Sequence, residues 1–333
     1  MSTSRLIGSL YFHSSDERPP SMLVTSLAHV AWQVDDYVLF TNINPLFFPR
    51  KIQDAITIVN PSEVETLETR QILAQLTSAW ATNKLPVNYA PIELHCFRRW
   101  LILRDYLETL NHEDSSRLIF CHDWDDIVVG NIKHEILNQI SNLSAFATVR
   151  SRALIIAKST NEFGKLSLSP NNITLNLATL RLLVLEITNL FRLHHDLCRP
   201  LNAALNFCDM YPLAALWYRL QCFSKLGSVI NLADIEAFRN APHFSENIRE
   251  TINFAYSLIH FDPPLQRDYK YLDATLDPAL NSFLLFDTLS YTTKRIFHFH
   301  FQGVEGKYLF NLNTHVVLSS YQQNIPALAN LLQ

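Results

Sequence analysis

Apolar positions group into short strand-like runs and longer helix-like runs, and the two kinds alternate over residues 1–165. Short apolar runs bounded by turn-forming residues are typical of buried strands, whereas longer runs with apolar positions three or four apart are typical of helices. The alternation predicts an α/β protein, with a mostly parallel sheet flanked by helices. Strands are expected at residues 6–13, 37–41, 55–59, 118–120 and 153–157, and helices at residues 21–33, 61–80, 91–110 and 132–140.

The pattern becomes more mixed in residues 166–333. A strand that runs into a helix is expected over residues 173–191, and a further helix opens near Asp209. No linker or internal repeat separates the halves, so we expect one continuous domain over residues 1–333. The remaining expected elements are strands at residues 228–231, 283–286 and 295–301 and a closing helix at residues 325–332.

Composition and charge narrow the class of protein. The chain has 333 residues, 48% of them hydrophobic, which allows a well-buried core. Its net charge of -4 argues against a nucleic-acid partner, and no polybasic block marks a membrane surface. No apolar segment reaches the roughly 18–20 residues of a transmembrane helix. The five cysteines are odd in number and lack close pairing, which suits a reducing compartment, so we expect a cytoplasmic protein.

The segment RLIFCHDWDDIVVGN, residues 117–131, carries the most chemistry in the chain. An apolar run leads into Asp123, Asp125 and Asp126, which indicates a buried strand with an acidic tip. Two aspartates one residue apart can both face a divalent cation, since Mg²⁺ and Mn²⁺ prefer several oxygen ligands. The alternative is that these aspartates cap the following helix or are solvated.

The expected helix at residues 91–110 is apolar nearly all round and still carries arginines. A buried guanidinium group needs an anionic partner. Arg104 has Glu108 at i+4, which predicts a pair on the helix surface. Arg99 has no such acid, so we expect it to meet a phosphate or an acidic residue of a site.

Four segments in a fixed order resemble the GT-A class of nucleotide-sugar glycosyltransferases, the bacterial polysaccharide type in particular. They cover most of the chain, from about residue 5 to residue 310, and are more specific together than singly. They are the helix segment ELHCFRRW at residues 93–100, the motif Asp123-Trp124-Asp125, the pair Asp209-Met210, and the segment from His300 through Gly303 to Lys307.

The resemblance implies a Rossmann-like GT-A fold, with residues 1–165 binding the nucleotide sugar and residues 166–333 on the acceptor side. It implies a metal-dependent transfer of a sugar from a nucleotide diphosphate, which we expect to be UDP-linked, to a glycan or small-molecule acceptor. A site with carboxylates and one imidazole favours Mn²⁺ over Mg²⁺. Peripheral contact with a membrane is left open. The metal ligands implied are Asp123, Asp125 and His300, the last preferred to His298.

The other roles implied are those of the donor and acceptor sites. Asp209 would act as general base on the acceptor hydroxyl or orient it, or else cap a helix. The residues implied at the nucleotide sugar are Arg99, Trp124, Asp126, Asn176, Gly303 and Lys307.

Two other functions stay open at this point. A phosphohydrolase of the haloacid dehalogenase kind also has Asp-x-Asp after an apolar strand, although normally on the first strand of its domain. Here 116 residues precede Arg117. A GT-A-shaped binding protein without catalysis is the third hypothesis, since Trp124 stands where such enzymes usually have a small residue.

Overall fold

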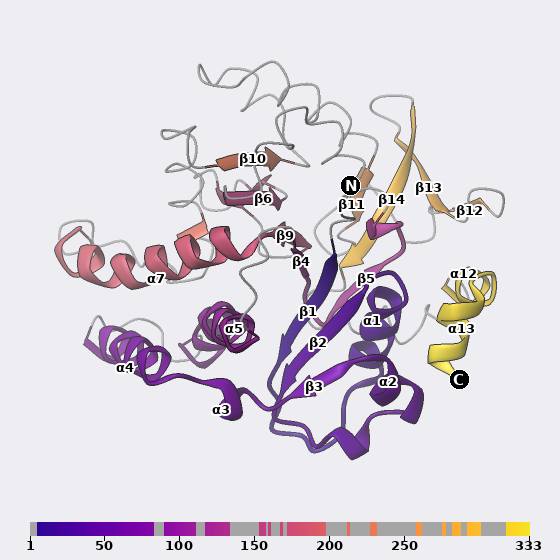
Figure 1. Cartoon of the computed structure of the whole chain (residues 1–333). Helices are drawn as coiled ribbons and strands as arrows, with labels where there is room; N and C mark the ends of the chain where they lie inside the picture. Colours follow the sequence, from indigo (N-terminus) through magenta and orange to yellow (C-terminus); the bar gives the residue numbers. More distant parts are fainter. Residues whose placement is uncertain are drawn as a thin grey trace.

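A computed structural model describes the fold of the chain (Figure 1). The residues that it describes are 5–82, 90–110, 117–133, 153–157, 159–160, 167–168, 172–197, 212–213, 227–231, 258–261, 275–277, 282–287, 292–300 and 318–333. The expected division of the chain at residue 165 remains a prediction.

The main sheet has seven strands in the order β10-β6-β9-β4-β1-β2-β3. Strand β9 is antiparallel to both of its neighbours, and the other neighbouring pairs are parallel. The expectation of an α/β protein with a mostly parallel sheet is therefore confirmed. The strands are β1 (Leu6–Phe12), β2 (Asp36–Thr41), β3 (Thr57–Val59), β4 (Leu118–Cys121), β6 (Ala153–Ala157), β9 (Ile173–Leu175) and β10 (Gly227–Asn231).

Helices cover both faces of this sheet (Figure 1). On one side lie α1 (Ser21–Ala31) and α2 (Arg50–Ala55), together with the carboxyl-terminal helices α12 (Ser319–Gln323) and α13 (Pro326–Leu332). On the other lie α4 (Leu67–Thr82), α5 (Ala90–Thr109) and α7 (Leu177–Leu197). None of the helices in the described part of the chain is both long enough and apolar enough to cross a membrane.

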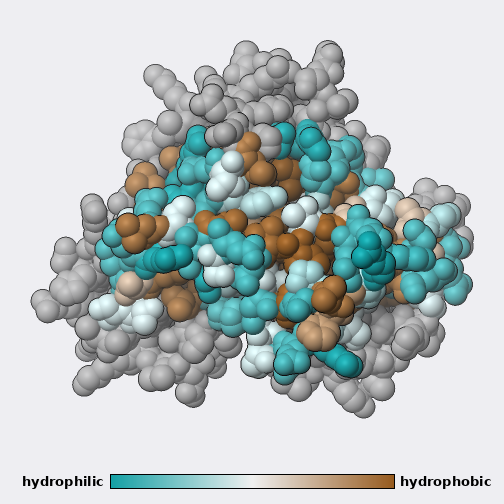
Figure 2. All heavy atoms as spheres, turned by 60° about the horizontal axis from the view of Figure 1, so that its bottom comes forward, coloured by the Kyte–Doolittle hydropathy of each residue, from teal (hydrophilic) through white to brown (hydrophobic). Residues whose placement is uncertain are grey.

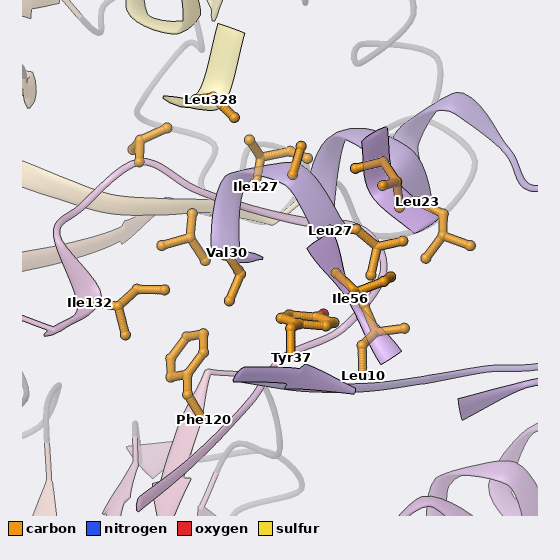
Figure 3. Close-up of a cluster of buried hydrophobic side chains, with 14 of the residues drawn as sticks. Leu10, Leu23, Leu27, Val30, Tyr37, Ile56, Phe120, Ile127, Ile132 and Leu328 are labelled. Atoms are coloured by element: carbon orange, nitrogen blue, oxygen red, sulfur yellow. The ribbon is translucent and has the colours of Figure 1, made fainter. Parts of the chain in front are cut away.

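Two hydrophobic cores lie on the two faces of the sheet. Along β2, Tyr37 and Leu39 join the core beneath α1, and Val38 and Phe40 join the core beneath α5. A strand buried on both faces reads as a continuous apolar run, as β2 and β4 do. Leu23, Leu27 and Val30 of α1 point towards Tyr37 and Leu10 in the first core (Figure 3).

A second sheet continues from the acidic segment. Its strand order is β11-β14-β13-β12, and β5 pairs with β14 in antiparallel fashion. The apolar run before the three aspartates thus belongs to one sheet and the apolar run after them to the other. The strands are β5 (Asp126–Val128), β11 (Leu258–Phe261), β12 (Thr275–Asp277), β13 (Ser282–Asp287) and β14 (Thr292–His300), and the two-stranded sheet of β7 (Ser159–Thr160) and β8 (Ser167–Leu168) lies apart.

The expected helix at residues 61–80 is two helices, α3 (Pro61–Val64) and α4. The break falls at Glu65 and Thr66, where the backbone amide of Thr66 donates to Asp105 Oδ2 at 2.9 Å. Tertiary partners for these two residues outweigh the helical propensity of the segment. The 3₁₀ turn η1 (Pro45–Phe47) and helix α2 were not predicted. Only Ile132 and Lys133 of the expected helix at residues 132–140 are described, and both are helical.

The expected surface pair of Arg104 and Glu108 is wrong. Arg104 is buried, and its guanidinium contacts Asp105 Oδ1 at 2.6 Å and Glu68 Oε2 at 3.1 Å. Glu108 pairs instead with Arg181 of α7 at 3.2 Å. The i+4 rule compares partners on one helix only, and here the packing of α4 and α7 against α5 supplies closer ones.

His29 of α1 is fully buried and contacts both strand β5 of the second sheet and helix α12. Its Nδ1 donates to the backbone oxygen of Val128 at 2.8 Å, and its Nε2 faces Gln322 Nε2 at 3.2 Å. The ring also stacks on Tyr321, with 5.7 Å between ring centroids. Burial lowers the pKa of His29 to about 4, so the ring is neutral at pH 7.

We expect the protein to lose stability as the pH falls from about 6.5 towards 4. In this range of pH, His29 is protonated in the unfolded state but stays neutral in the folded state. The free energy of unfolding therefore falls by about 1.4 kcal/mol for each pH unit. His29→Asn keeps a donor for Val128 and should unfold with a shallower dependence on pH. Urea unfolding at pH 7.5, 6.5, 5.5 and 5.0 measures this, and equal slopes in the two proteins would contradict it.

Candidate functional site

The three aspartates lie in a tight turn at the carboxyl end of β4. The amide of His122 donates to Ser9 of β1 at 3.3 Å and ends the pairing of β4 with β1. The amide of Asp126 then donates to the backbone oxygen of Asp123 at 3.2 Å, which closes the turn. We call residues 123–126 the acidic turn. Strand β1 starts near the amino-terminal label and runs towards the lower part of Figure 1, as does its parallel partner β4.

The face of the molecule at this end is mixed in polarity. Seen from below, hydrophobic residues gather near its middle and hydrophilic residues border them (Figure 2). In doubly wound proteins, ligands bind outside the carboxyl ends of the strands. The acidic turn therefore lies at the edge of the sheet where a ligand is expected.

Buried hydrogen bonds fix the backbone of the acidic turn. Ser26 of α1 donates from Oγ to the backbone oxygen of Asp126 at 2.7 Å. His122 Nδ1 lies 3.1 Å from the backbone oxygen of Asp123 and 3.2 Å from Ser26 Oγ, and Tyr37 contacts His122 Nε2 at 2.5 Å. Because the backbone oxygen only accepts, Nδ1 carries the proton and Tyr37 donates to Nε2. Burial lowers the pKa of His122 to about 4, which agrees with a neutral ring.

Glycine at position 8 makes room for Tyr37 in this network. A Cβ atom on Gly8 would come within 2.4 Å of Tyr37 Cδ2, closer than van der Waals contact allows. The phenol that orients His122 thus lies directly over the backbone of β1.

The Asp126 side chain is 0% exposed and joins the acidic turn to the second sheet. His298 Nδ1 lies 3.0 Å from Asp126 Oδ1, and Asn172 Nδ2 donates to Asp126 Oδ2 at 3.1 Å. Asn172 adopts a left-handed conformation with φ of 54°, which asparagine tolerates better than most residues. The placement of Asp126 at the nucleotide sugar remains a prediction, and this burial favours an anchoring role.

Asp123 is more accessible and pairs with Arg99. Arg99 Nη1 contacts Asp123 Oδ1 at 2.6 Å, with the two side chains 13% and 28% exposed. The guanidinium also lies over the ring of Trp100, 4.6 Å from its centroid. Arg99 therefore meets an acidic site residue, one of the two kinds of partner that its sequence context predicted.

The rest of the acidic turn faces β1. Trp124 packs edge-on against Phe12, with 5.3 Å between ring centroids, so its indole covers the end of that strand. Asp125 is 8% exposed. Beyond Phe12, the rings of His13 and His95 stack at 4.4 Å, and Tyr11 contacts His95 Nδ1 at 3.2 Å.

The predicted metal ligands are only partly described. Among the residues that the structure describes, no group of three or more histidine, cysteine, aspartate or glutamate side chains is arranged to hold a metal ion. His300 stands opposite Asp126 in the register of β14 and β5, but its side chain is outside the described part. The metal assignment of Asp123, Asp125 and His300 therefore remains a prediction.

Asn176 caps a helix. Its Oδ1 accepts from the amide and the hydroxyl of Thr179, at 3.0 and 2.8 Å, at the start of α7. Its assignment to the donor sugar remains a prediction beside this capping role. Asp209, Gly303 and Lys307 lie outside the described residues.

Several residues of the site were not predicted from the sequence. Ser26, His122, Asn172 and His298 hold the acidic turn, and three of them are far from it in sequence. One signal was available for His298, because it alternates with His300 and so lies on the same face of β14.

We expect Asp126→Ala to lower the free energy of unfolding by about 3 kcal/mol, because it leaves the buried polar groups of Asn172 and His298 without their acceptor. Asp54→Ala is the matched control. Asp54 forms an exposed pair with Arg50, and such pairs contribute at most about 1 kcal/mol. Urea unfolding at pH 7.5 measures both variants, and equal losses would show that Asp126 does not anchor the turn.

Comparison with known proteins finds likeness to solved structures alone. The sequence matches no protein-family model and no curated protein. A solved structure described as "PaToxG Glycosyltransferase" matches with a TM-score of 0.38 and 12% sequence identity, over 76% of this chain and 85% of that chain. A likeness of this size is too weak to assign a fold or an activity.

Proposed function

We propose that this protein is a metal-dependent glycosyltransferase of the GT-A class, which moves a sugar from a nucleotide diphosphate to an acceptor hydroxyl. The observation that carries the proposal is the acidic turn at the carboxyl end of β4, where Asp123 and Asp125 follow a central strand and Arg99 contacts Asp123. Carboxylates can bind the metal ion of a metal–diphosphate complex, and a neighbouring guanidinium can bind its phosphate oxygens.

The arrangement of the main sheet supports the same class. A parallel sheet with one antiparallel strand, β9, brings the ends of β1 and β4 to one edge. The haloacid dehalogenase alternative is not favoured, because its aspartates follow the first strand of the domain. Here β4 follows β1, β2 and β3 in the chain and lies between β1 and β9 in the sheet.

A divalent cation fits the chemistry of the donor set. Asp123, Asp125 and His300 would hold it, and two carboxylates with an imidazole suit Mn²⁺, with Mg²⁺ as the alternative. The bound ion would neutralise the charge of the departing diphosphate.

The remaining residues would bind the two substrates. Arg99 and Lys307 would contact the phosphates of a UDP-linked donor, for which a guanidinium is well shaped. Asp209 would accept the proton of the acceptor hydroxyl or orient that hydroxyl. Trp124, between the two aspartates, would set the size of the sugar pocket, and Asn176 and Gly303 would be further donor contacts. Asp126 would support the donor site through the backbone of the acidic turn, because its side chain is fully buried.

We expect UDP to bind in the presence of Mn²⁺ and to bind much more weakly without it. Isothermal titration of UDP, with and without Mn²⁺, measures this dependence. Asp125→Ala should abolish the metal-dependent part, because it removes a carboxylate ligand. Asp54→Ala removes an exposed carboxylate from α2 and is expected to bind as the wild type does.

Two results would contradict the proposal. One is absence of binding by UDP and by other nucleotide diphosphates. The other is binding that needs no metal and is unchanged in Asp125→Ala. Binding without transfer or hydrolysis of any nucleotide sugar would favour a GT-A-shaped binding protein instead.

A further inference from the structure

Arg99 is held against Asp123 by more than a surface ion pair. The 2.6 Å contact is short for a charge-assisted hydrogen bond, and the Arg99 side chain is only 13% exposed. Its planar face lies over Trp100, which is itself 0% exposed. Without a ligand, these two contacts hold the positive charge of Arg99 beside Asp123.

This position conflicts with the binding of a bare cation by Asp123. A divalent ion and a guanidinium that share one carboxylate repel each other, which lowers the affinity for the ion by roughly tenfold even with strong screening. Asp126 cannot take the place of Asp123 as a metal ligand unless it gives up its contacts with His298 and Asn172. These contacts are fully buried. A metal ion on its own must therefore bind against the charge of Arg99.

A diphosphate reverses the sign of this effect. It brings negative oxygens to which a guanidinium donates in a bidentate manner, so Arg99 gains a partner when it leaves Asp123. The repulsion between Arg99 and the metal ion is then offset by the attraction between Arg99 and the diphosphate that binds the metal. Two ligands that each improve the site for the other bind with positive coupling.

We propose that Arg99 screens Asp123 from a bare divalent cation and moves to the diphosphate when metal and nucleotide bind together, so that the site loads them as one complex. This inference rests on the proposed function, because it takes the diphosphate and the metal from there. It assigns Arg99 a second role, as the residue that makes the binding of the two ligands interdependent.

The test measures two affinities whose changes have opposite signs. In Arg99→Gln, Mn²⁺ alone, followed by electron paramagnetic resonance, is expected to bind about tenfold more tightly, because a like charge has gone. UDP at saturating Mn²⁺, followed by isothermal titration, is expected to bind about tenfold more weakly, because a phosphate contact has gone. A merely structural role for Arg99 would weaken both.

Arg181→Gln is the control for loss of one positive charge. Arg181 forms an exposed ion pair with Glu108. Glu108 lies nine residues after Arg99 on α5, which places it about 13 Å from Arg99 along the helix axis. Both affinities should match the wild type. Arg99→Lys keeps the charge without the planar fork, so Mn²⁺ affinity should stay low while UDP affinity falls; it also serves if Arg99→Gln does not fold.

The outcomes separate the two ideas. If the wild type binds UDP with Mn²⁺ but neither affinity changes in Arg99→Gln, or both fall, the screening role of Arg99 is wrong and the proposed function survives. If the wild type binds neither Mn²⁺ nor UDP, the proposed function fails and the inference fails with it. Opposite changes in Arg99→Gln, absent in Arg181→Gln, support the inference.

Discussion

The arrangement of the site depends on one buried carboxylate. Asp126 is 0% exposed, accepts a hydrogen bond from Asn172 and contacts His298, and so joins the loop before β9 and the strand β14 to the end of β4. A buried charge without such partners would be strongly unfavourable. Around it, Ser26 and His122 hold the backbone of the acidic turn, so Asp123 and Asp125 are presented from a backbone that is fixed from both sheets.

Polar groups of three kinds surround the acidic turn, and each has a distinct task. Neutral groups such as His122 and Tyr37 fix the backbone without adding charge. Asp126 joins the two sheets and is withdrawn from the surface. Arg99 and Asp123 form an ion pair in which both side chains are partly accessible. The polar interior thus supports a small outer region in which charged side chains are partly accessible.

Much of the main sheet could be predicted because its strands are buried on both faces. β2 and β4 read as apolar runs, β1 does so except at Gly8 and Ser9, and the turn into three aspartates marks the end of β4. The passage of the chain from one sheet to the other at Trp124 could not be predicted from the sequence. The residues of β5 would be apolar in either sheet, and only the pairing of β5 with β14 shows that it belongs to the second one. Arg104 shows the same limit, because its partners lie on α4 and beside it rather than one turn along α5.

The choice between His298 and His300 was beyond the sequence for a related reason. Both residues lie on the same face of β14 by the two-residue period of a strand, so periodicity gives them equal standing. The register places His300 opposite Asp126, while the side chain of His298 reaches Asp126 diagonally. The choice of metal ligand remains a prediction. Asn172 carried a weaker signal, as one of two adjacent asparagines before a strand, a composition typical of turns.

The contact between Asp126 and His298 spans 172 residues of sequence. Contacts between distant residues form late in folding, because the intervening chain must first be ordered. During synthesis, the acidic turn emerges from the ribosome long before β14 is made, and until then Asp126 has no imidazole partner. The contact is therefore complete only after β14 has been made, so a chain that ends before β14 lacks the partner that anchors the acidic turn.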